Sequence, residues 1–168
     1  MINEIITDKT YLSEVMSELP TRVLLNKGVT GCGGTYVELH SSRNSLILVP
    51  TIELAKNKKE DGFLIVYGKT KNEEIIKYFN SKIKYKKIIG TYDCLNRLIS
   101  LYPKILSYFL LVDEYHILFN SYSFRSEAIQ FLLNNYKRFD DYVFMTATPL
   151  DSDIILDEIK DLPRVNIV

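Results

Sequence analysis

The sequence has no tryptophan, few cysteines and histidines, and no excess of charge of either sign. The two cysteines, Cys32 and Cys94, are too few for a disulfide framework, and the two histidines do not complete a structural zinc pattern with them. Lys plus Arg and Asp plus Glu each number 21, so the general basic character of a nucleic-acid-binding protein is absent. Any site for a polyanion must therefore be a local patch.

Long hydrophobic runs are also missing. The N-terminus, MINEIITDKT, carries acidic residues and lacks the apolar stretch of a signal peptide, and no run reaches the length of a membrane span. We therefore expect no secretion and no membrane partner, and a cytoplasmic location, where cysteines stay reduced. Abundant lysine, asparagine, isoleucine and tyrosine are typical of an A+T-rich genome, such as a bacterial or phage genome.

The chain alternates between two kinds of segment. Apolar runs rich in β-branched and aromatic residues predict strands. These runs are RVLL (22–25), SLILV (45–49), GFLIVY (62–67), KKIIG (86–90), YFLLV (108–112), YVFM (142–145) and VNIV (165–168). Helical spacing predicts helices over YLSEVMSEL (11–19), ELAKNKKE (53–60), KNEEIIKYFN (71–80), DCLNRLISLY (93–102) and FRSEAIQFLLNNYKRF (124–139).

This alternation predicts an α/β fold with a mainly parallel sheet and helices on both faces. The 168 residues contain no repeat and no linker, so we expect one domain over 1–168. Ligands of such sheets bind beyond the carboxyl ends of the strands. The loops that follow the strands are therefore the places to look for chemistry.

The loop after the run RVLL is rich in glycine. Gly28, Gly31, Gly33 and Gly34 can adopt conformations closed to other residues, so successive backbone N–H groups can surround an anion at a helix start. The stretch GVTGCGGT (28–35) matches the phosphate-binding pattern GxxxxGK[ST] at every fixed position except the lysine. Thr35 stands where a hydroxyl can ligate Mg²⁺.

The missing lysine, replaced by Gly34, is the main departure from that pattern. Loss of one such electrostatic donor costs about 3–4 kcal/mol at the transition state, so we expect binding to survive but fast hydrolysis to be lost. Lys27, just before the loop, has two interpretations. It either folds over the loop and replaces the missing charge, or it is a solvated residue at a strand end.

Two adjacent acidic residues follow the buried run YFLLV. Carboxylates at such a position are costly unless they bind a cation or take part in proton transfer. In a phosphoryl-transfer site the first acid, here Asp113, holds Mg²⁺, and the second, here Glu114, orients or deprotonates the attacking water. The glycine loop upstream and FMTATPL (144–150) downstream strengthen this interpretation.

Together these blocks resemble the first RecA-like domain of superfamily 2 helicases and translocases, the DEAD/DEAH-box group. The matching blocks are GVTGCGGT as the Walker A loop, LILVPTIELA (46–55) as motif Ia, IIGTYDCLNRL (88–98) as motifs Ib and Ic, VDEYH (112–116) as the Walker B box, and MTATP (145–149) as motif III. The resemblance covers nearly the whole chain and implies a RecA-like P-loop NTPase sandwich.

The resemblance also implies roles for individual residues. The candidate ATP-binding residues are Lys27, Gly28, Val29, Thr30, Gly31, Cys32, Gly33, Gly34 and Thr35. Thr35 and Asp113 would hold Mg²⁺; Asp113, Glu114 and His116 form the catalytic set, with Glu114 as base. His116, Thr146 and Thr148 would couple the nucleotide site to nucleic acid. The candidate nucleic-acid contacts are Pro50, Thr51, Thr91, Tyr92 and Arg97.

Those contacts position phosphates and carry no base readout, so the implied partner is single-stranded or duplex nucleic acid of any sequence. The family closes its active site between two RecA-like domains, and only the first is present in this chain. Two functions stay open. One is the nucleotide-binding half of a nucleic-acid-dependent ATPase, completed by a second RecA-like domain or partner protein in trans. The other is a catalytically dead pseudo-helicase that serves as a nucleic-acid-binding or assembly scaffold.

Overall fold

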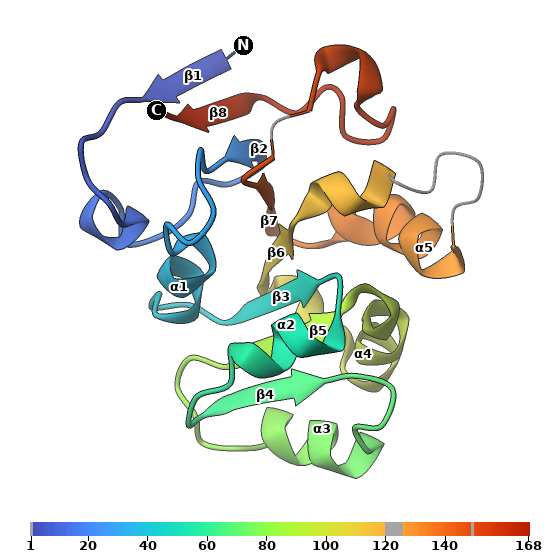
Figure 1. Cartoon of the computed structure of the whole chain (residues 1–168). Helices are drawn as coiled ribbons and strands as arrows, with labels where there is room; N and C mark the ends of the chain where they lie inside the picture. The colour runs from blue at the N-terminus through green and yellow to red at the C-terminus, as the bar shows by residue number, and fades with distance from the viewer. Residues whose placement is uncertain (1, 120–125, 149) are drawn as a thin grey trace.

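The computed structural model describes residues 2–119, 126–148 and 150–168. Within these residues eight strands form one sheet in which every pairing is parallel (Figure 1). The strands are β1 (Ile2–Ile5), β2 (Val23–Asn26), β3 (Ser45–Val49), β4 (Phe63–Val66), β5 (Lys87–Thr91), β6 (Phe109–Asp113), β7 (Asp141–Thr146) and β8 (Arg164–Ile167). Their spatial order is β1-β8-β2-β7-β6-β3-β5-β4.

Helices cover both faces of this sheet. The helices are α1 (Gly34–Leu39), α2 (Ile52–Asn57), α3 (Asn72–Phe79), α4 (Leu95–Leu101) and α5 (Glu127–Asn135). α1 and α2 contribute to the apolar cluster on one face, while α3, α4 and α5 contribute to the cluster on the other. Successive strand residues alternate between the two clusters, as Ile47 and Leu48 do, because a strand points its side chains to opposite faces. The predicted α/β architecture is confirmed.

The apolar runs correspond to strands β2 to β8, and the helical segments after residue 50 correspond to α2 to α5. The predicted helix over 124–139 is α5 followed by a 3-10 turn, Tyr136–Arg138. Its first two residues lie outside the described part of the chain. None of the helices that the structure describes is long and apolar enough to cross a membrane.

The predicted helix over 11–19 is wrong. Only a 3-10 turn, Leu12–Glu14, forms there. A segment this short is not stable as an isolated helix, so its tertiary contacts decide its shape. The backbone N–H of Leu12 donates to the Cys32 carbonyl oxygen at 2.8 Å. Leu12 and Leu19 are both buried against the α1 side of the sheet.

Strand β1 was not predicted. It lies at the edge of the sheet, pairs only with β8 among the described strands, and three of its four side chains are exposed. An edge strand with little burial carries no apolar run, so its sequence gives no strand signal.

Candidate functional site

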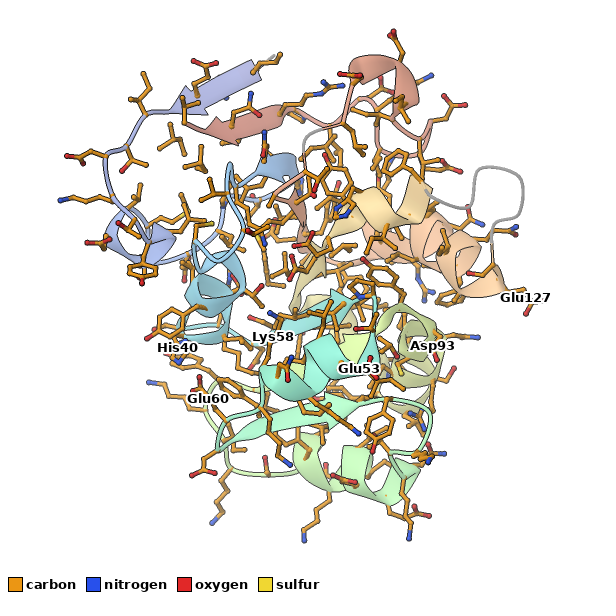
Figure 2. The ribbon with its side chains drawn as sticks, in the orientation of Figure 1. His40, Glu53, Lys58, Glu60, Asp93 and Glu127 are labelled. Atoms are coloured by element: carbon orange, nitrogen blue, oxygen red, sulfur yellow. The ribbon has the colours of Figure 1, made fainter. Side chains whose placement is uncertain are left out.

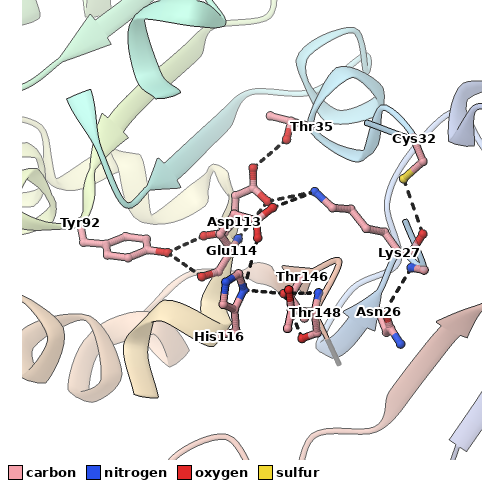
Figure 3. A network of polar contacts seen from close by, with 11 residues as sticks. Asn26, Lys27, Cys32, Thr35, Tyr92, Asp113, Glu114, His116, Thr146 and Thr148 are labelled. Atoms are coloured by element: carbon pink, nitrogen blue, oxygen red, sulfur yellow. Dashed lines mark hydrogen bonds and ion pairs between the residues drawn. The ribbon is translucent and has the colours of Figure 1, made fainter. Parts of the chain in front are cut away.

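Strands β2, β7 and β6 are neighbours in the sheet, so the segments that follow them meet at one edge (Figure 3). The glycine loop follows β2, the acidic pair ends β6, and Thr146 ends β7. This arrangement brings together residues that are far apart in the sequence. The parallel register, with Asp113 opposite Met145 and Asn26 opposite Thr146, fixes their relative height.

The glycine loop depends on conformations that favour glycine. Gly28, Gly31 and Gly33 have φ values of +79°, +76° and +82°. A Cβ atom on Gly28 would also lie 2.8 Å from the Ile167 carbonyl oxygen. The side chain of Asn26 accepts a hydrogen bond from the Gly28 N–H at 3.1 Å and so shapes the start of the loop. Sequence reasoning missed Asn26, although an asparagine side chain commonly accepts a hydrogen bond from the backbone N–H two residues on.

Thr35 and Asp113 meet across the site. The Thr35 hydroxyl donates to Asp113 Oδ2 at 2.8 Å, although the two residues are 78 positions apart. Both side chains are buried. The other carboxylate oxygen of Asp113 accepts the Glu114 backbone N–H at 2.9 Å. Two oxygen groups that the sequence assigned to one metal ion are therefore adjacent.

Lys27 is a buried cation in contact with both acidic residues. It is only 8% exposed, and its Nζ lies 3.1 Å from Glu114 Oε1 and 3.7 Å from Asp113 Oδ1. Burial alone lowers the pKa of Lys27, but the negative charges of Asp113 and Glu114 outweigh burial and raise the pKa above its usual value. The interpretation of Lys27 as a solvated residue is therefore wrong.

A chain of polar contacts leads from Glu114 to the end of β7. Glu114 has a positive φ of 54°, a strained conformation for a residue with a side chain. Its Oε2 lies 3.3 Å from His116 Nδ1, which lies 2.7 Å from the Thr146 hydroxyl. That hydroxyl in turn accepts the Thr148 backbone N–H at 3.0 Å. The structure thus joins the residues to which the resemblance assigned coupling; Pro149 lies outside the described residues.

A cleft of about 400 Å³ opens beside these groups. Its walls are the glycine loop, the acidic pair, α1, and the end of α2. The residues that line it are Lys27, Thr30, Gly31, Gly33, Gly34, Thr35, Tyr36, Leu39, Leu54, Asn57, Lys58, Lys59, Glu60, Asp113 and Glu114. Lys58 and Glu60 both line the cleft, and His40 Nε2 is 3.2 Å from Glu60 Oε2 (Figure 2). The α2 side of the cleft was not expected from the sequence, because α1 and α2 reach the same cleft only through their packing on the sheet.

The remaining loop residues differ in exposure. Val29 and Thr30 are exposed, whereas Cys32 is buried with its Sγ 3.6 Å from the Lys27 carbonyl oxygen. Gly34, the first residue of α1, is buried against Met145. The Cys32 side chain therefore packs inside the loop, against the backbone of Lys27.

The candidate nucleic-acid contacts separate into two groups. Pro50 is half-buried and Thr51 is exposed, and the Thr51 hydroxyl caps α2 by accepting the Leu54 N–H at 3.3 Å. The other three make their contacts inside the protein. Those residues are Thr91, Tyr92 and Arg97.

Tyr92 has a specific internal position. Its hydroxyl donates to the Asp113 carbonyl oxygen at 2.5 Å and lies 3.3 Å from the Glu114 carbonyl oxygen. Burial, reinforced by both neighbouring carboxylates, raises the pKa of Tyr92 well above its usual value. Arg97 donates to the carbonyl oxygens of Thr70 and Tyr67 at 2.8 and 2.7 Å. Tyr92 therefore holds the acidic turn in place rather than facing a surface ligand.

Comparison with protein-family models and with curated proteins found no match to this chain. Among the residues that the structure describes, no three or more His, Cys, Asp or Glu side chains are grouped to hold a metal ion. The oxygen atoms of Thr35 and Asp113 are the groups that could ligate a divalent cation at this site.

Proposed function

We propose that the chain is a helicase-like, nucleic-acid-associated ATP-binding domain, the first RecA-like half of a nucleic-acid-dependent ATPase or translocase. The observation that carries this proposal is the contact between the Thr35 hydroxyl and the Asp113 carboxylate beside a loop of positive-φ glycines. The single all-parallel sheet with helices on both faces is consistent with a RecA-like sandwich.

The residues present fit a magnesium nucleotide. Mg²⁺ prefers oxygen ligands and takes only one or two from protein, the rest coming from water and phosphate. Thr35 and Asp113 offer such a pair. Gly31 and Gly33 line the cleft, and a Cβ atom on Gly31 would have no other atom within 4 Å, so the loop is open to a ligand there. Backbone N–H groups in such a loop can surround phosphate oxygens.

Glu114 is suited to act as the general base. Its side chain is 22% exposed and borders the cleft, so a water molecule can reach it. When bound, Mg²⁺ would neutralise charge on the phosphates. Glu114 would orient the attacking water and accept its proton, while His116 holds the second carboxylate oxygen. The contacts of His116 with Thr146 would pass a change at Glu114 to the segment after β7.

Turnover by this domain alone should be low. Superfamily 2 enzymes complete their site with a second RecA-like domain, and position 34 lacks the usual lysine. The proposed partners are accordingly nucleic acid, bound without sequence preference, and a second RecA-like domain or protein in trans. Pro50 and Thr51, at the exposed start of α2, are the surface groups most suited to a phosphate backbone.

Calorimetric titration with Mg²⁺ and a non-hydrolysable ATP analogue tests the proposal. We expect saturable binding that is lost in Asp113→Ala and kept in Asp141→Ala. Asp141 is a suitable control because it lies at the other end of β7 and is 49% exposed. Circular dichroism of each variant checks that it is folded. Absence of binding at millimolar ligand would overturn the proposal and favour the scaffold function.

Nucleic-acid association needs its own measurement. Fluorescence anisotropy with two single-stranded oligonucleotides of unrelated sequence should give equal affinities that fall as salt increases, because phosphate contacts release counterions. A preference of about tenfold or more for one sequence would contradict a backbone-only contact, since a base readout is worth 1–3 kcal/mol.

A further inference from the structure

We propose that Lys27 supplies the positive charge to the terminal phosphates that a lysine at position 34 would normally supply, and that it leaves an ion pair with Asp113 and Glu114 to do so. This inference rests on the proposed nucleotide site. It assigns the missing charge to a residue one position before the glycine loop. The same residue is also the ion-pair partner of both acidic residues.

The packing around Gly34 explains why the lysine stands at position 27 and not at position 34. A Cβ atom at position 34 would lie 2.6 Å from the Sδ and 3.0 Å from the Cε of Met145. It would also lie 3.4 Å from the Cδ of Lys27. Met145 is fully buried at the end of β7. The absence of a side chain at Gly34 therefore accommodates Met145, and the Lys27 side chain passes within van der Waals distance of the same position.

The ammonium group of Lys27 ends where a phosphate charge is needed. It lies 3.1 Å from Glu114 Oε1 and 3.7 Å from Asp113 Oδ1, while Asp113 Oδ2 holds the Thr35 hydroxyl. Lys27 also lines the cleft together with the glycine loop. A phosphate bound between that loop and a metal on Thr35 and Asp113 would thus lie next to this ammonium.

Lys27 is the counter-ion of two carboxylates. A divalent cation that binds Asp113 must compete with it, since both are attracted to the same oxygen atoms. With the charge of Asp113 neutralised by a bound cation, the Lys27 ammonium would be free to turn from the carboxylates to the phosphates. Metal binding and the positioning of Lys27 on phosphate are therefore coupled.

This coupling predicts opposite effects of one substitution. Lys27→Met keeps the length of the aliphatic chain against Gly34 but removes the charge. We expect it to bind Mg²⁺ alone about threefold tighter or more, because a competing cation is gone. We expect it to bind the Mg²⁺ complex of a non-hydrolysable ATP analogue about 10- to 100-fold more weakly, because a charged hydrogen bond to phosphate is lost. The affinity for AMP, which lacks the terminal phosphates, should fall much less in this variant.

Lys58→Met is the matched control, since Lys58 lines the same cleft from the end of α2. Isothermal titration calorimetry of both variants and the parent protein, with Mg²⁺, the ATP analogue and AMP, gives all the comparisons. An equal loss of analogue affinity in Lys58→Met and Lys27→Met would mean that general charge attraction explains the effect, and would overturn the inference. Unchanged analogue affinity in Lys27→Met would also overturn it.

The double variant Lys27→Met/Glu114→Gln serves if Lys27→Met does not fold, because it removes one positive and one negative charge together. It is compared with Glu114→Gln alone, and a loss of analogue affinity of about tenfold or more is again expected; equal affinities would overturn the inference. Failure of the parent protein to bind the analogue is a distinct result. It would overturn the proposed nucleotide site, whereas binding that does not depend on Lys27 would overturn this inference alone.

Discussion

Replacing Glu38 with glutamine should lower the free energy of unfolding by about 3 kcal/mol. Glu38 lies in α1 and is fully buried. Its carboxylate accepts hydrogen bonds from Arg43 Nε at 2.9 Å and from Arg43 Nη2 at 2.6 Å. It also accepts from the hydroxyls of Ser41 at 3.1 Å and Ser45 at 2.5 Å. These contacts fix α1, which carries Thr35, to the start of β3.

The magnitude follows from what the substitution leaves behind. Breaking a buried ion pair by removing one charge costs 3–5 kcal/mol. The Arg43 side chain is 22% exposed and also lies 3.7 Å from Glu18, so water and a second acid compensate in part, and the lower end of that range applies. The glutamine side chain would in addition point its NH₂ group, itself a hydrogen-bond donor, at the donor groups that surround the Glu38 carboxylate.

Urea unfolding of the parent protein, Glu38→Gln and Asp157→Asn measures this difference. Asp157 forms an ion pair with Lys160 at 3.0 Å, but its side chain is 88% exposed. The same carboxylate-to-amide change there should cost less than about 1 kcal/mol, because exposed pairs contribute little. A loss below about 1 kcal/mol in Glu38→Gln, or equal losses in the two variants, would refute the reasoning.

Three further predictions concern titration, chemistry and metal binding. The ammonium of Lys87 is held by four oxygen atoms, but burial, with a smaller contribution from nearby Arg43, lowers the pKa of Lys87 to about 8. Above pH 8, Lys87 loses its proton in the folded protein but keeps it in the unfolded chain. The free energy of unfolding should therefore rise by about 2 kcal/mol between pH 8 and 9.5. Urea unfolding across this range tests it, and a Lys87→Met variant with the same rise would contradict it. Glu114→Gln should lower any nucleic-acid-stimulated ATP turnover about 100-fold or more while keeping ATP-analogue affinity within about threefold, as measured by phosphate release and calorimetry; equal turnover would exclude Glu114 as the base. Thr35→Val should weaken analogue binding about tenfold with Mg²⁺ but leave it unchanged in EDTA, and an equal loss in both conditions would indicate a packing defect instead.

Much of the fold was predictable because its signals are local. Runs such as SLILV and YFLLV are apolar throughout, which is typical of strands buried on both faces of a parallel sheet. The segment over 11–19 also has helical spacing of its apolar residues, yet it forms only a short 3-10 turn. Its apolar residues find partners on α1 and the glycine loop, and those partners are not adjacent in the sequence.

The residues of the candidate site could be predicted from the sequence, but some of the contacts between them could not. The glycine loop, Asp113 and Glu114 each follow a strand, and parallel strands end at one edge, so their meeting could be expected. The inward position of Tyr92 could not, because its hydroxyl bonds to backbone atoms 21 positions away. A tyrosine in a phosphate-contacting block and a tyrosine that supports an acidic turn look the same in a sequence.

The sequence by itself determined the alternation of strands and helices and the residues that follow each strand, because hydrophobic periodicity and glycine placement act over a few neighbouring residues. Only the tertiary structure decided where the Lys27 side chain lies. Position 34 has no side chain, Met145 packs beside it, and β6 brings the two carboxylates within reach of the Lys27 ammonium. Such a contact depends on the order of strands in space, which no stretch of neighbouring residues encodes.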